Sequence, residues 1–363
     1  MPYSDTIDRE ETLLTIALGH CLGISLTNQK QILDDCGSAV KARESFPQID
    51  AMLPKAKTEL DWAEKNHVQC IPYTSPLYPE RLRHCADAPV ILYYIGNADL
   101  NARHIISMVG TRRITEYGKT MCQRLVQEIK ALVPDTLIIS GLAYGVDVHC
   151  HRAALSLGMS TIGVLAHGLN QIYPQSHRQT AAQMTSQGGL LTEFPSSTHI
   201  DKRNFVQRNR IVAGMSDAVV VVESAAKGGS LITAELAQDY DREVFAVPGR
   251  ITDPYSAGTN RLIINNIAHS ITCGQDIIDI LGWEVGKQQL EMDFDYAECT
   301  MHNAECSGDP ILFALSQAAG STLSISDLSD KTNIAIGPLR GRLMTMEMKG
   351  LVRMLPGNRC SLV

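Results

Sequence analysis

Two short segments of this 363-residue chain carry side chains that suit the binding of an anion. The first is the turn Gly110-Thr111-Arg112, which follows the apolar run 105–109 and precedes a predicted helix. The N-terminus of a helix presents free N–H groups and the positive end of its dipole, so a phosphate can bind there, and an arginine adds a full charge. An ordinary strand-to-helix turn with solvated arginines explains this segment, taken alone, equally well.

The second segment is residues 202–210, KRNFVQRNR. Four positive charges fall within nine residues that include no acid, around one of the six phenylalanines of the chain. Basic side chains neutralise phosphates and release counterions, while an aromatic ring stacks on a base of any identity. The pattern therefore favours a nucleic-acid contact. A solvated basic helix with Phe205 in the core is the alternative.

Short apolar strands that alternate with helices must position these segments. The predicted strands are 105–109, 137–140, 161–165, 218–222 and 244–247. This alternation predicts an α/β fold with an extended Rossmann-like, mostly parallel sheet covered on both faces. Several strand ends carry small residues, namely Gly110, Ser140-Gly141, Gly168 and Gly228-Gly229-Ser230. Because such ends share one edge of an open sheet, we expect a ligand crevice there.

The rest of the chain divides into further predicted domains. Residues 1–70 have the pattern of short helices, either a SAM-like or helix-hairpin-helix-like DNA-binding module or an interaction or spacer domain. Residues 71–283 form the sheet domain, which opens with a connector rich in proline and tyrosine that ends in a strand. An acidic linker is predicted at 284–309, and three helices with a terminal hairpin at 310–363 predict a winged helix.

The net charge of −7 does not exclude a polyanionic ligand. Residues 284–309 hold seven acids and one base, whereas residues 71–283 hold eighteen of each. The central domain can therefore carry a basic patch. No apolar run approaches the ~20 residues that a membrane span needs, and the first residues lack the pattern of a signal peptide. We expect a cytoplasmic protein without a membrane partner.

Neither a metal site nor a common cofactor is predicted. Ten cysteines are scattered singly without a CxxC pair, and a structural role is favoured over a metal site for His149-Cys150-His151. The GxGxxG and GxxxxGK[ST] signatures are missing, which argues against NAD and against ATP hydrolysis of the common types.

Several segments in register resemble the DNA processing protein A family (DprA, also called Smf). They are VGTRRITEYG, SGLAYGVD with HRAAL, TIGVLAHGLNQIYP, LLTEFP, FVQRNRIVAGMSDAVVVVES, GGSLITAELA, REVFAVPGR and GTNRLI. The resemblance covers roughly residues 70–283, and the tail resembles a winged helix found in many members. It implies a protein without catalytic residues that binds single-stranded DNA, forms a homodimer and helps load RecA recombinase in natural transformation.

The resemblance also assigns residues to the nucleic-acid site. The G-S/T-R motif falls on Gly110, Thr111 and Arg112, and the basic and aromatic contacts fall on Lys202 and Phe205. The R-N-R motif falls on Arg208, Asn209 and Arg210, whose arginines either contact DNA or brace the fold at Ser140-Gly141; both possibilities stay open.

The tail and the activity each allow a second interpretation. The tail is only mildly basic, so a protein contact is as well supported there as duplex binding. The apolar segment 262–267 is the predicted dimer contact. The alternative function is a Rossmann-like nucleotide-processing enzyme resembling a phosphoribohydrolase, with Asp147, Glu193, Glu223 and Glu235 as candidate acid–base groups.

Overall fold

A computed structural model of the chain describes residues 8–21, 23–284, 309–316, 322–334, 336–348, 351–355 and 359–362. The chain forms two compact units, Met1–Gly286 and Lys287–Val363. The predicted acidic linker lies outside the described residues apart from Glu284 and Asp309, and the predicted hairpin turn Gly357-Asn358 lies outside them too.

The first unit is built on a nine-stranded sheet with the order β1-β2-β6-β5-β4-β3-β7-β8-β9. Neighbours from β6 to β9 pair in parallel, and β2 pairs antiparallel with both β1 and β6. This confirms the predicted α/β class with a mostly parallel sheet. The strands are β1 Gln69–Pro72, β2 Ile91–Gly96, β3 Ile105–Val109, β4 Leu137–Ser140, β5 Thr161–Val164, β6 Gly188–Thr192, β7 Ala218–Val221, β8 Glu243–Ala246 and β9 His269–Ser270.

Helices cover both faces of this sheet because its strands are apolar on both sides. In β3, Ile105 and Val109 join one buried cluster with α9 and α10, while Ile106 and Met108 join a second cluster with α6, α7 and α12. The helices after β3 are α6 Glu116–Leu132, α7 Val146–Ser156, α8 Arg178–Ser186, α9 Lys202–Gly214, α10 Gly229–Asp239, α11 Ala257–Ile264 and α12 Gly274–Leu281.

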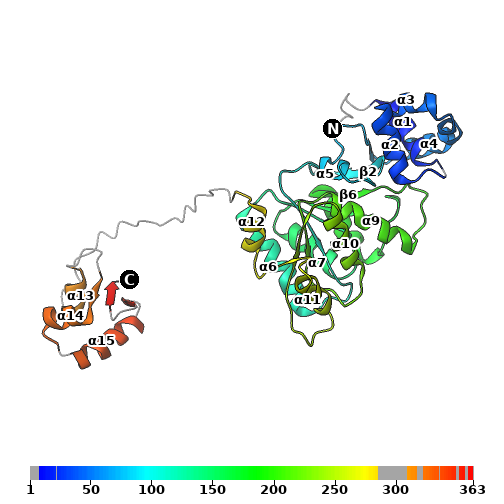
Figure 1. Ribbon diagram of the computed structural model, residues 1–363. Coiled ribbons are helices and arrows are strands. Elements are labelled where there is room, and N and C mark those ends of the chain that lie inside the picture. Colours follow the sequence, from blue (N-terminus) through cyan, green and yellow to red (C-terminus); the bar gives the residue numbers. More distant parts are fainter. Residues whose placement is uncertain are drawn as a thin grey trace. The chain divides into compact units, whose positions relative to one another are not determined.

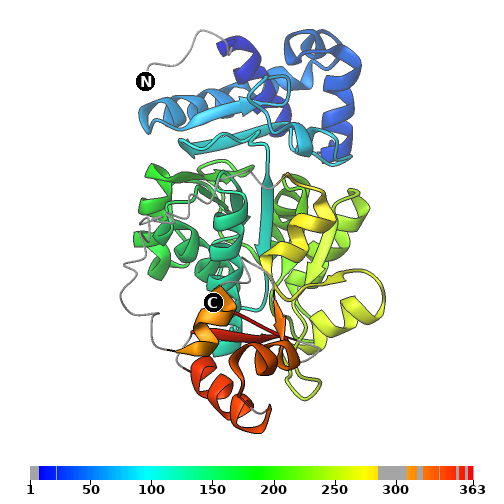
Figure 2. The same ribbon diagram turned by 90° about the vertical axis from the view of Figure 1, so that its left-hand side faces the viewer.

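Four N-terminal helices gather beside the β1–β2 edge of the sheet, where they are drawn in blue in both views (Figures 1 and 2). They are α1 Arg9–Gly19, α2 Leu26–Cys36, α3 Ala39–Ser45 and α4 Gln48–Lys65. The side chains of Asp8, Ser25 and Ser38 each accept a backbone N–H at the start of a helix. Gly37 ends α2 with a φ of 77°, a left-handed conformation that suits glycine. The helical prediction for this segment is therefore confirmed, while its boundary at residue 70 stays a prediction.

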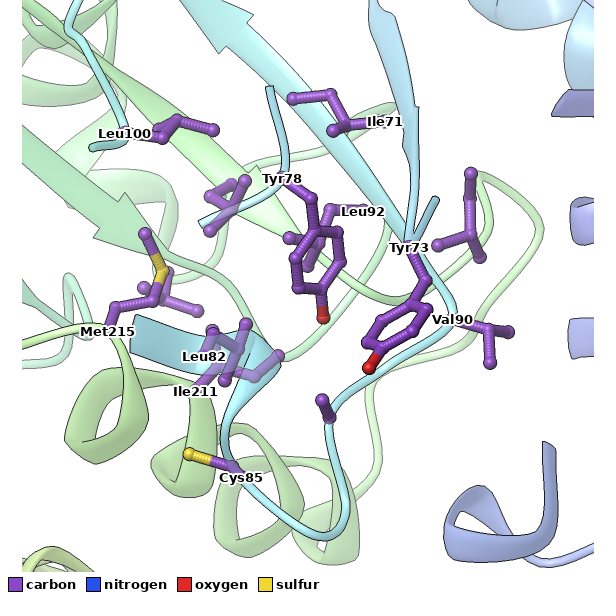
Figure 3. Close-up of a cluster of buried hydrophobic side chains, with 14 of the residues drawn as sticks. Ile71, Tyr73, Tyr78, Leu82, Cys85, Val90, Leu92, Leu100, Ile211 and Met215 are labelled. Carbon is purple, nitrogen blue, oxygen red and sulfur yellow. The ribbon is translucent and has the colours of Figure 1, made fainter. Parts of the chain in front are cut away.

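The segment that the sequence presents as a connector adds two strands to the sheet and a short helix, α5 Glu80–Arg83. Its apolar side chains pack against α9 and the residue that follows it, so that Tyr78 and Leu82 share one buried cluster with Ile211 and Met215 (Figure 3). The Tyr78 hydroxyl donates to the Pro89 carbonyl at 2.6 Å, so this buried polar atom is satisfied. This cluster anchors α9, the helix that carries the basic segment.

The described residues of the second unit form three helices and a three-stranded antiparallel sheet with the order β10-β12-β11. Its core includes Ile311, Leu328, Leu339, Leu343 and Val352. Its elements are α13 Pro310–Ser316, β10 Leu323–Ser324, α14 Ile325–Thr332, α15 Ile336–Met348, β11 Val352–Leu355 and β12 Arg359–Leu362. The three predicted helices and the pairing of the last two strands are present, while the winged-helix assignment stays a prediction.

In the described part of the chain, no helix combines the length and the apolar character that crossing a membrane requires.

His151 makes the first unit sensitive to acid. Its ring is fully buried on α7, and Nδ1 lies 2.7 Å from the Thr161 hydroxyl, which donates its own hydrogen to the Ile138 carbonyl. His151 Nδ1 is therefore the protonated nitrogen, and Nε2 has no hydrogen-bond partner. Burial lowers the pKa of His151 from 6.5 to about 3. The unfolded chain thus takes up a proton below about pH 6.5 that the folded chain refuses, so stability falls as the pH falls.

We expect the free energy of unfolding to fall by about 1.4 kcal/mol more in the wild type than in His151→Gln between about pH 7.5 and about pH 5.5. Urea denaturation followed by circular dichroism at the two pH values measures this difference. Equal losses in the two proteins would show that His151 is not the acid-sensitive group.

Candidate functional site

A crevice opens at the carboxyl ends of the central strands, around β3 and β7. The chain runs from β3 to β4 on one side and returns to β7 on the other, so this is the point where the strand order reverses. The pocket there has a volume of about 720 Å³, within the range of ligand sites. The predicted site residues that line it are Gly110, Thr111, Arg112, Gly141, Lys202, Phe205, Arg208 and Asn209.

The turn after β3 is held by Glu223, which follows β7. The Thr111 N–H donates to the Glu223 carbonyl at 2.7 Å, and the Thr115 N–H donates to the Glu223 carboxylate at 2.9 Å. Thr115 in turn caps α6 by accepting the Gly118 N–H. A Cβ at Gly110 would overlap Val146 and the Glu223 carbonyl, so this close approach requires glycine. The turn therefore has a fixed position, and the Arg112 side chain on it is exposed to solvent.

The exposed face of α9 meets Arg112 across the crevice. Lys202 and Arg112 are exposed, and Phe205 is half-buried. The Arg112 guanidinium carbon lies 5.2 Å from the centre of the Phe205 ring, a cation–π distance. The Tyr173 ring meets Phe205 edge-on at 5.9 Å between centroids. The two predicted segments, about ninety residues apart, thus form one surface with two cations and an aromatic ring.

Arg208 borders the same pocket but is buried beneath the exposed side chains of α9. Its side chain is 3% exposed and donates to the Val164 carbonyl at the end of β5. A Cβ at Gly141 would overlap its guanidinium, so glycine makes room for the arginine. Burial lowers the pKa of Arg208 to about 10, which leaves it charged at neutral pH.

Asp147 balances that buried charge. Its carboxylate accepts the Gly141 and Ala143 N–H groups at 3.1 and 3.3 Å. Burial raises the pKa of Asp147, and the nearby Arg208 opposes this shift. Arg208 and Asp147 therefore brace the loop after β4.

Arg210 also points inward. It pairs with the buried carboxylate of Glu193 and donates to the Asp87 carbonyl. Burial raises the pKa of Glu193, and Arg210 counteracts it. Ser140 is fully buried as well, and its hydroxyl donates to the Met108 carbonyl at 2.6 Å. Neither Arg210 nor Ser140 lines the pocket. Of the two roles left open for the arginines, the geometry supports the internal brace for both.

Sequence reasoning missed some of the pocket-lining residues. Lys227 lines the pocket just before Gly228-Gly229-Ser230, where α10 begins. The Asn209 amide donates to the Gly229 carbonyl at 3.2 Å, so α9 and this glycine loop are tied together. The sequence could have indicated Lys227, because it directly precedes the glycine loop that was predicted to border the crevice. Tyr173 gave no signal because its contact with Phe205 spans 32 residues.

Sequence reasoning also missed Glu59 on α4. It is buried and accepts both the N–H and the hydroxyl of Ser196, each at 2.7 Å. Ser196 lies in the loop that leads from β6 to Lys202. The N-terminal helices therefore hold the loop that starts the basic helix, a contact across 137 residues that no local pattern indicates.

The exposed cations of the crevice have no carboxylate of their own. Arg112, Lys202 and Lys227 form no ion pair with any residue in the described ranges, whereas Arg81 pairs with Asp217 and Arg203 with Asp201. Unpaired cations with a shared opening are available to an anionic ligand.

The candidate acid–base carboxylates mostly have partners within the protein. Asp147, Glu193 and Glu223 accept the hydrogen bonds given above, and Glu235 is exposed on α10. Across the described residues, no three His, Cys, Asp or Glu side chains gather as they would around a metal ion. His149 and His151 contact different groups, the Gly145 carbonyl and the Thr161 hydroxyl.

The two classes of arginine should separate in stability measurements. We expect Arg208→Ala to lower the free energy of unfolding by about 3 kcal/mol or more, because it leaves Asp147 buried without its counter-charge. Arg112→Ala should change it by less than about 1 kcal/mol, since only an exposed cation–π contact is lost. Urea denaturation of both variants tests this. Similar losses in the two would contradict the bracing role of Arg208.

Comparison with known proteins identifies a family whose model matches the sheet domain of this chain. The family model of DNA recombination-mediator protein A matches residues 69–282. The DNA processing protein DprA of Bacillus subtilis is 38% identical over 243 residues, which cover 67% of this chain and 81% of that protein. The protein Smf of Escherichia coli is 33% identical over 318 residues, 86% of this chain and 81% of that protein.

Solved structures of DNA processing protein A are similar to this chain in fold and sequence. DNA processing protein A from Streptococcus pneumoniae superposes with a TM-score of 0.58 at 31% identity, over 74% of this chain and 92% of that one. DNA processing protein A from Helicobacter pylori, whose structure addresses its single-stranded DNA binding mode, superposes with a TM-score of 0.53 at 30% identity, over 59% and 95%. The chain belongs to the DNA recombination-mediator protein A family.

Proposed function

We propose that this protein binds single-stranded DNA in the crevice, with little regard to base sequence. The proposal rests on one observation: the Arg112 guanidinium lies 5.2 Å from the Phe205 ring. Lys202 is on the same helix as Phe205 and lines the same pocket. Arg112 holds a backbone phosphate beside the start of α6, Lys202 neutralises another, and Phe205 stacks a base.

Charge distribution supports a polymer over a single nucleotide. The three unpaired cations come from three elements: Arg112 from the turn after β3, Lys202 from α9 and Lys227 from the loop before α10. Such a spread suits successive phosphates of one strand. The single-stranded DNA binding mode described for DNA processing protein A from Helicobacter pylori is consistent with this assignment.

The family places the protein in DNA recombination, and the finer role is part of the proposal. The bound strand is incoming DNA in natural transformation, which the protein protects and on which it helps to load RecA recombinase, in the cytoplasm. A homodimer forms through residues 262–267, which include the end of α11, where Ile264 is 77% exposed. The N-terminal helices and residues 310–363 serve as accessory domains, the latter as a winged helix.

The proposed activity is binding without catalysis. A phosphoribohydrolase-like reaction needs a free acid–base group near a bound sugar. Asp147 is the candidate carboxylate that lines the pocket, and it is engaged by two N–H groups and faces Arg208. Incubation with nucleoside monophosphates, assayed for base release, tests this alternative.

We expect Arg112→Ala and Lys202→Ala each to weaken binding to all sequences and to reduce the salt slope by about one, since each removes a phosphate contact. Phe205→Ala should cost about 1–3 kcal/mol of binding free energy with little change in the salt slope, because stacking releases no counterion. Fluorescence anisotropy with a mixed-sequence oligonucleotide at two salt concentrations measures both effects.

The chain offers matched controls beside two of these positions. Arg113 is exposed next to Arg112, and Arg203 is exposed next to Lys202, yet neither lines the pocket. Arg113→Ala and Arg203→Ala should keep near wild-type affinity. If the control variants lose as much affinity as the site variants, general charge rather than this crevice binds the strand.

A further inference from the structure

Two exposed tyrosines continue the aromatic surface of the crevice away from Phe205. Tyr173 is 42% exposed and touches the Phe205 ring, as described above. Tyr144, in the loop after β4, is 48% exposed, and its hydroxyl lies 3.5 Å from the Ser176 hydroxyl, three residues beyond Tyr173. Tyr173 thus lies in the pocket beside Phe205, and Tyr144, outside the pocket lining, contacts the segment that follows Tyr173.

Buried histidines hold both tyrosines in place. The Tyr173 N–H donates to His167 Nε2 at 3.3 Å, and His167 Nδ1 donates to the Gly168 carbonyl. The Tyr144 ring meets the ring of His177 edge-on at 5.0 Å, and His177 Nδ1 donates to the Leu142 carbonyl at 2.9 Å. Both histidines are at most 3% exposed. The tyrosines are therefore ordered by the core although half of each faces solvent, which is the arrangement of a prepared stacking platform.

The segment that carries these tyrosines is poor in acids, which suits it to contact a polyanion. Residues 141–180 contain a single acid, Asp147, which is 7% exposed and turned toward Arg208. This stretch therefore presents no exposed carboxylate that would repel a phosphate. Arg178 follows His177 directly, is exposed, and pairs with no acid in the described ranges.

We infer that Tyr173 and Tyr144 form an extension of the DNA site, on which further bases of the same single strand stack, with Arg178 beside them to neutralise a phosphate. This rests on the proposed binding of single-stranded DNA. The extension takes bases that lie beyond the nucleotide at Phe205, so it contributes only when the strand is long enough to reach it.

Length dependence provides the test. Full-length protein is titrated with labelled oligothymidylates of about 4 to about 16 nucleotides. We expect Tyr144→Ala and Tyr173→Ala to lower affinity for the longest strand roughly 5- to 100-fold and to leave the shortest strand less affected. Phe205→Ala should lower affinity at every length. Tyr144→Phe and Tyr173→Phe, which keep the ring, should bind within about twofold of wild type. Arg178→Gln should reduce the salt slope for the long strand only.

The outcomes separate the two proposals. If the wild type binds and both tyrosine-to-alanine variants match it at every length, the extension is wrong and the main site stands. If the wild type binds no oligonucleotide, both fail. Photo-cross-linking of wild type to a 5-iodouridine strand gives an answer that does not depend on variant folding. Cross-linked peptides should contain Tyr144 or Tyr173, and cross-links confined to other surfaces would overturn the extension.

Discussion

The buried charge of Arg208 is the constraint on which the crevice depends. A guanidinium inside a protein needs an opposite charge and hydrogen-bond acceptors, or its desolvation cost is prohibitive. Here the acceptor is the last carbonyl of β5, the counter-charge is Asp147, and Gly141 supplies the space. These partners belong to three segments of the sheet edge. Because all must meet one side chain of α9, the helix has little freedom to move against the strand ends.

Because Arg208 fixes α9 against the strand ends, it also fixes the direction of the α9 side chains that line the pocket. Lys202, Phe205 and Asn209 follow one another at helical spacing and line the pocket, whereas Arg208 lies buried at its base and Arg210 is buried outside it. The cluster of positive charges thus contains two kinds of residue. Buried arginines set the position of the helix, and the exposed Lys202 and the half-buried Phe205 face Arg112 across the opening. Glu193 and Asp147 are engaged by the buried arginines, and the exposed cations of the crevice form no ion pair within the described residues, which is the electrostatic basis of the proposed function.

The sequence was sufficient to predict much of this fold. β3 and β4 have the predicted bounds, and Gly110 begins the turn directly after β3, because buried parallel strands read as short apolar runs. The strand order and the role of each arginine were out of reach. Strand β6 begins with two glycines and was not recognised, and β1 lies beside prolines and was missed, whereas β2 is the strand predicted at the end of the connector. The pairs Arg210–Glu193, Glu59–Ser196 and Tyr173–Phe205 join residues far apart in sequence, so no periodicity reveals them.

A crystal structure of the protein with a short oligothymidylate tests the central claim most directly. The account predicts a backbone phosphate within hydrogen-bonding distance of the Arg112 guanidinium and a base stacked on the Phe205 ring, with Arg208 still covered beneath them. A strand bound elsewhere, for example to residues 309–362, with the crevice free of nucleotides, would contradict it.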